Sequence, residues 1–161
     1  KNNLNNKKEI NEHSYVVKHI KNILSKYGDN VKQGKTSMLK LNYAYHLETK
    51  ITTKNIHNTH ILKILKNIYP TPALSGYPTN DAIDKIKSLE PFDRGYYAGA
   101  VGMYNIKGEG NFFASIRSAL IRKNKIYYFA GGGITKDSQD IKEWEETEIK
   151  LKHIKSIIHS E

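Results

Sequence analysis

The sequence predicts one α+β domain built around an antiparallel sheet. Apolar residues recur at helical spacing near both ends of the 161-residue chain, over 9–27 and 137–159. Between them, residues 37–51 alternate apolar and polar side chains, which is the pattern of a half-buried strand. Two further strand-like runs, 96–105 and 111–121, flank the turn sequence IKGEG, as in an antiparallel hairpin. A chain of this length can bury the core of one domain.

The first part of the chain is expected to form a helix and then a strand. The polar segment 1–8 is expected to be disordered or incomplete, so that 9–161 forms the folded portion. Gly28 follows the first helix as its expected C-cap. The strand within 37–51 should carry His46 on its polar face. Its opposite face should carry Leu39, Leu41, Tyr43, Tyr45 and Leu47.

Backbone-restricting residues are concentrated in the middle of the chain. A short helix over 58–68, with Asn58 or Thr59 as its N-cap, leads into the segment PTPALSGYP. All four prolines lie within 70–91, and nine of the eleven glycines lie at or after Gly76. Proline fixes φ, and glycine permits turns and close approach. This concentration therefore favours a rigid wall around a small-molecule site.

Three more elements are predicted after the proline segment, besides the hairpin. A helix begins behind Thr79 or Asn80 as its N-cap. A strand, KIYYFAGGG, follows a turn at RKNK and ends in three consecutive glycines. The last helix has Asp137 or Ser138 as its N-cap. Its apolar stripe comprises Ile141, Trp144, Leu151, Ile154 and Ile158.

Composition argues against several classes of protein. No apolar run approaches the roughly 18 residues that a membrane span needs. No signal peptide is visible, although the sequence begins with Lys1 and not with Met. A cytoplasmic protein is therefore expected. The absence of cysteine excludes disulfides and thiolate metal sites. The net charge of +10 suggests a nucleic-acid-binding module as an alternative. Only three residues are arginine, however, and 13 lysines against 4 acidic residues concentrate the charge in 1–66.

Arg117 is a candidate for binding an anion. The predicted strand places it mid-strand on a face with small and apolar residues, where a buried guanidinium needs an anionic partner. It could grip a carboxylate or phosphate, or it could be an edge-strand arginine that reaches solvent. Gly131, Gly132 and Gly133 could let backbone approach a ligand, but an ordinary strand exit has the same pattern.

The last helix carries a candidate metal site. Glu143, Glu146 and Lys150 are spaced i, i+3 and i+7 and therefore share a face. Neighbouring carboxylates can hold Mg²⁺, which prefers oxygen ligands. The alternative is a solvated face with an ion pair between Glu146 and Lys150. Glu12 and His46 fit surface or structural roles as well as ligand roles.

Taken in chain order, the motifs resemble those of a known family. They are NEHSYVV, YHLETKI, PTPALSGYP, LEPFDRGYYAGAVGMY, GEGNFFASIRSALI, YYFAGGGI and EWEETEIKLK. In order and spacing they resemble the C-terminal part of the chorismate-utilising enzymes, from about Lys8 to the end of the chain. PTPA followed by a small residue and Gly, then EPFDRG, looks most like isochorismate synthase. Anthranilate, aminodeoxychorismate or salicylate synthase is the alternative within the family. The resemblance implies layered antiparallel sheets flanked by helices, here as an incomplete C-terminal portion.

The resemblance implies Mg²⁺ as cofactor. Glu12 and Glu146 match the family's metal-binding glutamates, and Glu143 matches a second acidic position near the metal. In the family's reaction water adds beside the ring carboxylate while the distant hydroxyl leaves. In the family a lysine acts as general base on the water and a glutamate as general acid on the departing hydroxyl. Both residues are expected upstream of the matched region. The chain is therefore expected to be inactive alone.

The resemblance also implies the ligand and the residues that hold it. Arg117, Lys150 and the backbone of Gly131 match groups that bind the carboxylates of chorismate. Four further matches line the pocket, namely Ala73, Leu74, His46 and Tyr97. The complete protein is expected to be a monomer. Its product would feed menaquinone, siderophore or salicylate synthesis.

Overall fold

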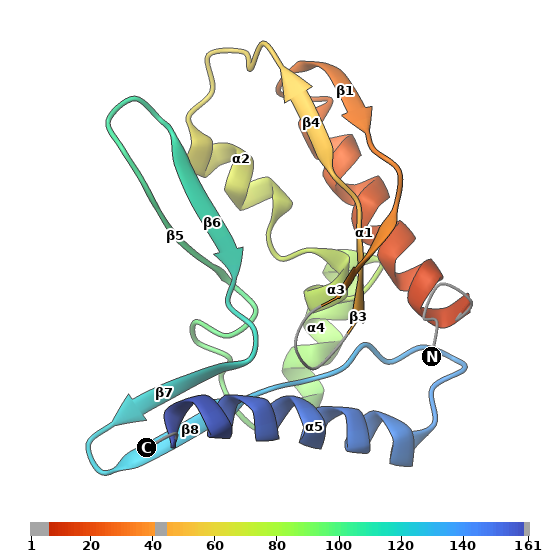
Figure 1. Ribbon diagram of the computed structural model, residues 1–161, viewed down its shortest axis with the longest axis vertical. Helices are drawn as coiled ribbons and strands as arrows, with labels where there is room; N and C mark the ends of the chain where they lie inside the picture. Colours follow the sequence, from red (N-terminus) through yellow and green to blue (C-terminus); the bar gives the residue numbers. More distant parts are fainter. Residues whose placement is uncertain (1–6, 41–44, 160–161) are drawn as a thin grey trace.

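The structure, a computed structural model, describes residues 7–40 and 45–159 and confirms the α+β class (Figure 1). The helices are α1 (Lys7–Leu24), α2 (Ile61–Ile68), α3 (Pro72–Ser75), α4 (Thr79–Leu89) and α5 (Asp140–Ile158). The strands are β1 (Asp29–Gln33), β2 (Ser37–Lys40), β3 (Tyr45–Glu48), β4 (Ile51–Lys54), β5 (Ala100–Tyr104), β6 (Gly110–Ala114), β7 (Ser118–Arg122) and β8 (Lys125–Phe129). Within these ranges the strands form four antiparallel pairs, β1–β4, β2–β3, β5–β6 and β7–β8. No helix in the described part of the chain is long and apolar enough to cross a membrane.

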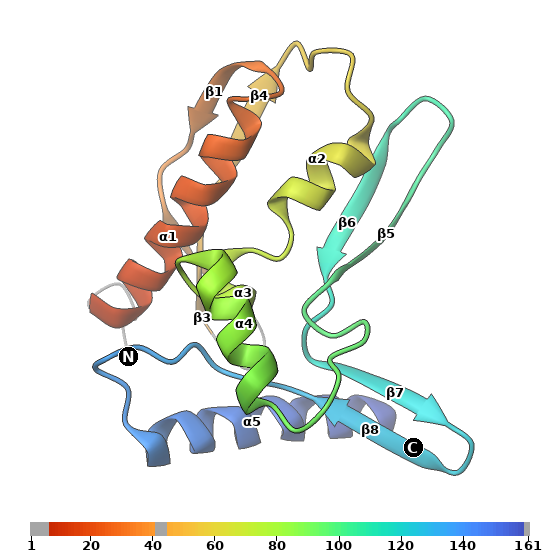
Figure 2. The same cartoon turned by 180° about the vertical axis from the view of Figure 1, so that it is seen from behind.

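The elements form two blocks and an arm. α1 packs against the β1–β4 pair and against α2 and α3, and α5 packs against β8. Figure 1 shows α3 and α4 between these two blocks and the β5–β6 hairpin projecting as the arm. Figure 2 shows α4 running from α3 toward α5. The arm contacts α2 through Tyr104, whose ring stands edge-on to that of His60 with centroids 5.3 Å apart.

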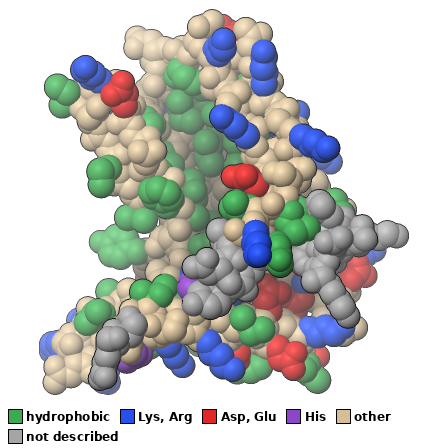
Figure 3. All heavy atoms as spheres, in the orientation of Figure 1, with side chains coloured by type: hydrophobic (Ala, Val, Ile, Leu, Met, Phe, Trp, Pro, Cys, Tyr) green, Lys and Arg blue, Asp and Glu red, His purple; other side chains and the backbone are tan. Residues whose placement is uncertain are grey.

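Few apolar side chains are fully buried. The buried hydrophobic residues that the structure describes include Val17 and Ile154. The predicted apolar stripe of α5 is correct at Ile154 but wrong at Ile141 and Trp144, which are 70% and 68% exposed. Figure 3 shows other hydrophobic side chains gathered between the arm and the block that holds α1. The chain thus presents broad apolar faces to its surroundings.

The prediction of a single strand over 37–51 is wrong. β2 and β3 lie antiparallel, with Leu39 opposite His46, and β4 pairs separately with β1. Leu39 is 40% exposed and Tyr45 is 42% exposed, so these two residues of the predicted apolar face are not buried. Alternation has the same period in one strand or in two paired strands, so it could not reveal that the pattern covers two strands. Leu41 and Tyr43 lie outside the described residues.

The predicted strand over 111–121 is also interrupted. β6 ends at Ala114 and pairs with β5, as predicted, whereas β7 begins at Ser118 and pairs with β8. In the break, the Ile116 amide donates to the Ala114 carbonyl oxygen at 2.9 Å, and Arg117 has a φ of 48°. Arg117 is therefore not mid-strand. It occupies left-handed backbone at a bend, which a non-glycine residue adopts only when its surroundings hold it there.

Helix boundaries differ from those predicted. α1 begins two residues early and ends at Leu24. A Cβ at Gly28 would lie 2.7 Å from Thr53 Oγ1, so space requires the glycine. The N-caps are His60 of α2, Pro78 of α4 and Gln139 of α5. Ser138 is not the cap because its Oγ instead accepts a hydrogen bond from the Thr135 amide at 3.0 Å.

Candidate functional site

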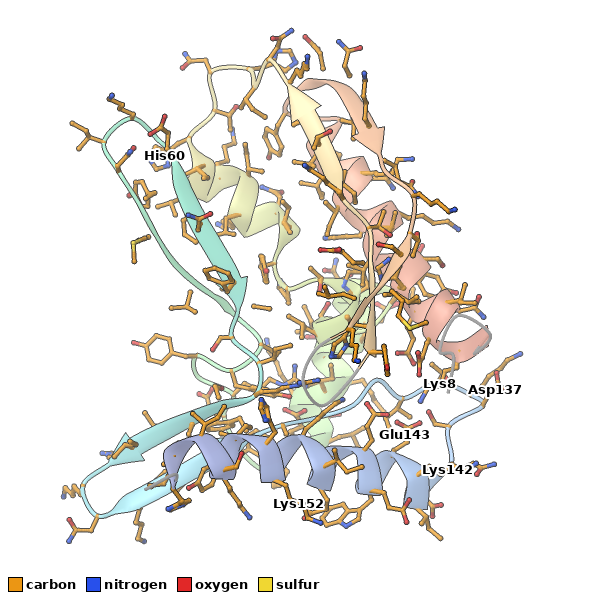
Figure 4. The ribbon with its side chains drawn as sticks, in the orientation of Figure 1. Lys8, His60, Asp137, Lys142, Glu143 and Lys152 are labelled. Carbon is orange, nitrogen blue, oxygen red and sulfur yellow. The ribbon has the colours of Figure 1, made fainter. Side chains whose placement is uncertain are left out.

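Two carboxylates from opposite ends of the chain meet beside one ammonium group. Glu12 comes from α1 and Glu143 from the first turn of α5. Lys8 Nζ donates a hydrogen bond to Glu143 Oε1 and lies 3.8 Å from Glu12 Oε1. Figure 4 shows Lys8 and Glu143 pointing toward one another between the starts of the two helices. The sequence reasoning missed Lys8, although its i,i+4 spacing to Glu12 was a usable signal.

The two carboxylates are not fully satisfied by the protein. Glu12 Oε1 and Glu143 Oε2 are buried and accept no hydrogen bond from the described residues. A glycine segment lies against them, because a Cβ at Gly132 would be 3.4 Å from Glu143 Oε2 and one at Gly133 would be 3.3 Å from Glu12 Oε2. Buried polar atoms are normally paired. These oxygens therefore mark a place where a cation fits.

The pKa values of the three groups reflect this crowding. Burial raises the pKa of Glu12, and the charges of Glu143 and Glu146 raise it further against the opposing effect of Lys8. The hydrogen bond from Lys8 lowers the pKa of Glu143 in spite of its burial. Burial lowers the pKa of Lys8, but the hydrogen bond and charge of Glu143 and the charge of Glu12 outweigh it, so the net shift is upward. One ammonium therefore balances more than one carboxylate.

The predicted metal set is only partly assembled. Glu146 forms an ion pair with Lys150 at 2.5 Å, and its side chain is 53% exposed. In the described ranges, no three His, Cys, Asp or Glu side chains are gathered closely enough to form a metal site. The Glu12–Glu143 pair nevertheless fits Mg²⁺ chemically, since its unsatisfied oxygens are hard anionic donors and a glycine segment lies against them.

Cationic groups lie beside the carboxylates. Lys150 Nζ donates to the Gly131 carbonyl oxygen at 2.9 Å. Arg117 Nη2 donates to His46 Nε2 at 3.3 Å, which makes that nitrogen the acceptor of a neutral imidazole. Burial lowers the pKa of His46, and the positive charges of Arg117 and Lys150 lower it further. His46 thus lies close to two positively charged side chains.

The proline segment forms a wall that Arg94 anchors. Ala73 and Leu74 belong to α3, where Ala73 is exposed and Leu74 half-buried. Arg94 Nη1 donates to the Leu74 carbonyl oxygen at 2.7 Å. The Arg94 guanidinium also lies 5.6 Å from the ring centroid of Tyr97. Sequence reasoning did not single out Arg94, although it stands i,i+4 to its partner Glu90.

Tyr97 links this wall to the glycine segment. Its ring stacks on Phe129 with centroids 5.6 Å apart. A Cβ at Gly131 would lie 2.8 Å from the Tyr97 hydroxyl. Burial raises the pKa of Tyr97 against the opposing charge of Arg94. Several of the predicted site residues therefore meet in pairs, namely Arg117 with His46, Lys150 with Glu146 and Gly131, and Glu12 with Glu143 through Lys8.

Comparison with known proteins identifies the family. The model of the family described as chorismate binding enzyme matches residues 1–159. The chain belongs to the chorismate-binding enzyme family. It is 37% identical to isochorismate synthase MenF of Bacillus subtilis over 159 residues, which cover 98% of this chain and 34% of that protein.

Two solved structures of the chorismate-binding family share the fold. One is a putative 2,3-dihydroxybenzoate-specific isochorismate synthase, DhbC, from Bacillus anthracis, with a TM-score of 0.85 and 29% identity over 94% of this chain and 41% of that chain. The other is anthranilate synthase component I from Streptococcus pneumoniae, with a TM-score of 0.84 and 28% identity over 94% of this chain and 35% of that one. The chain spans well under half the length of these relatives.

Proposed function

We propose that this chain supplies the chorismate- and Mg²⁺-binding part of an isochorismate synthase. The observation that carries the proposal is the unsatisfied carboxylate pair of Glu12 and Glu143, together with two cationic groups, Lys150 and Arg117, that both lie near His46. The positive charge of Lys150 contributes to lowering the pKa of Glu143, which supports the two halves acting as one site. The likeness to the Bacillus subtilis isochorismate synthase supports the specific activity.

The site suits a dianion. Chorismate carries two carboxylates, and desolvating them requires compensating positive charge. Arg117 and Lys150 would bind these groups, with the Gly131 backbone as a further contact. Glu12, Glu143 and Glu146 would hold Mg²⁺, which when bound polarises the ring carboxylate. Ala73 and Leu74 would form the wall near the reacting carbons, with His46 and Tyr97 completing the pocket.

The proposal assigns binding and orientation, not proton transfer, to this chain. The general base and general acid of the family's reaction would lie in the part of the longer relatives that this chain does not cover. We expect the 161-residue chain to bind chorismate without converting it. The complete protein would act as a monomer in the cytoplasm and would feed menaquinone, siderophore or salicylate synthesis.

Anthranilate synthase is the second candidate, because a structure of that enzyme matches the chain almost as well. Product analysis separates the two. The chain, joined to the portion that a complete relative carries before it, is incubated with chorismate and Mg²⁺, with and without ammonia. Isochorismate in both reactions supports the proposal. Anthranilate that appears only with ammonia assigns the chain to the second candidate instead.

A further inference from the structure

We propose that the Lys8 ammonium is an internal counter-ion that occupies the cation position of the Glu12–Glu143 pair and competes with Mg²⁺ for it. This inference rests on the proposed metal-binding role of that pair. It adds a residue of α1 that controls how readily the site loads.

The geometry places Lys8 where a cation would sit. Its Nζ donates to Glu143 Oε1 and lies 3.8 Å from Glu12 Oε1, so it stands between the two carboxylates. Lys8 and Glu12 come from successive turns of α1, whereas Glu143 lies 135 residues away in sequence on α5. The ammonium joins the two helices by charge at this point.

Electrostatics explains why the ammonium is needed when no metal is bound. The Glu143 side chain is 11% exposed and that of Glu12 is 35% exposed, so their repulsion is incompletely screened by water. Removing Lys8 leaves this repulsion uncompensated. An ammonium and a divalent cation beside the same two carboxylates would repel each other as well, so the two compete for the site.

The Lys8 side chain can move its ammonium away from the carboxylate pair. Lys8 is 23% exposed, and its four-carbon stem is flexible enough to carry the ammonium into solvent. A site that holds a cation beside its carboxylates in both states can stay folded without metal. Binding of Mg²⁺ then requires displacement of Lys8. The apparent affinity for Mg²⁺ equals the intrinsic affinity multiplied by the fraction of molecules in which Lys8 has left the site.

Calorimetric titration of Mg²⁺ into the 161-residue chain tests this with Lys8→Met, which keeps the length of the side chain and removes its charge. We expect Mg²⁺ to bind about tenfold more tightly to Lys8→Met than to the wild type. A tenfold change corresponds to a wild type in which Lys8 occupies the site in about nine-tenths of the molecules. Lys152→Met is the matched control, because Lys152 lies on the same helix as Glu143 but points away from the site in Figure 4. An unchanged or weakened affinity in Lys8→Met overturns the inference.

A second measurement uses the wild-type chain and so does not depend on the variant folding. Lysines are acetylated briefly with an activated ester, with and without saturating Mg²⁺, and modification is read residue by residue by mass spectrometry. Mg²⁺ should accelerate acetylation of Lys8 several-fold and leave Lys152 unchanged. Equal or slower acetylation of Lys8 with Mg²⁺ overturns the inference.

The outcomes also separate this inference from the proposed function. Chorismate binding with no effect of Lys8→Met on Mg²⁺ affinity refutes only the role of Lys8. Absence of Mg²⁺ binding to both forms refutes the role of Lys8 together with the metal assignment. Chorismate affinity, measured independently, decides the substrate assignment.

Discussion

Arg94 clamps the Leu74 carbonyl oxygen at 2.7 Å while its other guanidinium nitrogens hold both carboxylate oxygens of Glu90, at 2.7 and 2.5 Å. Glu90 is the C-cap of α4, and Leu74 lies in α3, within the proline-rich segment that was predicted to form the wall of the site. One side chain therefore fixes the wall to α4. The planar fork of arginine, which lysine lacks, makes these bonds simultaneously.

Replacement of Arg94 should loosen the wall. Arg94→Ala removes three hydrogen bonds and leaves the Glu90 carboxylate unpaired, so we expect a loss of about 1–3 kcal/mol in the free energy of unfolding. Chemical denaturation provides the measurement. Arg122→Ala at the exposed end of β7 should change stability by less than about 0.5 kcal/mol. Equal effects of the two substitutions would show that the clamp does not stabilise the wall.

Gly131 should tolerate no side chain while the Tyr97 hydroxyl is present. A Cβ at this position would lie 2.8 Å from that hydroxyl, so we expect Gly131→Ala to destabilise the chain by about 1–3 kcal/mol. Adding Tyr97→Phe removes the clashing oxygen and should recover most of the loss. Thermal unfolding of the two single variants and the double variant measures this coupling. If the losses of stability in the two single variants simply add in the double variant, the strain in Gly131→Ala does not arise from the Tyr97 hydroxyl.

Glu12→Gln should weaken Mg²⁺ binding without lowering the stability of the metal-free chain. Burial and the neighbouring charges of Glu143 and Glu146 disfavour the ionised form of Glu12, so a neutral side chain should maintain or increase stability without Mg²⁺. Affinity for Mg²⁺ should fall by about tenfold or more because an anionic ligand is lost. Glu145→Gln, exposed on α5, is the control and should change neither property. Undiminished Mg²⁺ affinity in Glu12→Gln would remove Glu12 from the metal site.

His46 should make stability depend on pH. Burial, Arg117 and Lys150 lower its pKa below the usual 6.5, so the unfolded chain binds a proton more readily than the folded one. The contribution of His46 is therefore fully present above pH 6.5 and is lost as the pH falls toward the lowered folded-state pKa. NMR titration of the His46 ring should show a midpoint below 6.5 that rises in Arg117→Met. A midpoint at or above 6.5 in the wild type would contradict the arrangement of charges.

Elements whose sequences carry a regular apolar period or a turn signal were predicted. Elements without such a signal were missed. The helical periodicity of α1 and the turn between β5 and β6 were sufficient signals, and the structure confirms both. β1 was missed because DNVKQ has a single apolar residue, Val31, and so no alternation. The bend at Arg117 was missed because a positive φ at arginine has no sequence signal.

The pairing of Glu12 with Glu143 could be predicted only through resemblance to the family. Glu12 and Glu143 lie 131 residues apart in sequence, and no local pattern reveals that α1 and α5 bring them together. Local i,i+4 spacing did mark Lys8 with Glu12 and Arg94 with Glu90, but such pairs are common on helix surfaces. The binding roles of the predicted site residues remain proposals.

In our proposal Arg117 and the carboxylate pair together bind chorismate. Calorimetric titration of chorismate into the chain, with and without Mg²⁺, measures this binding. We predict binding that is strengthened by Mg²⁺, abolished in Arg117→Glu and preserved in Arg122→Glu, which makes the same change of charge at the end of β7. Equal chorismate affinity in the two variants, or no chorismate binding alongside salt-sensitive binding of DNA, would contradict the account.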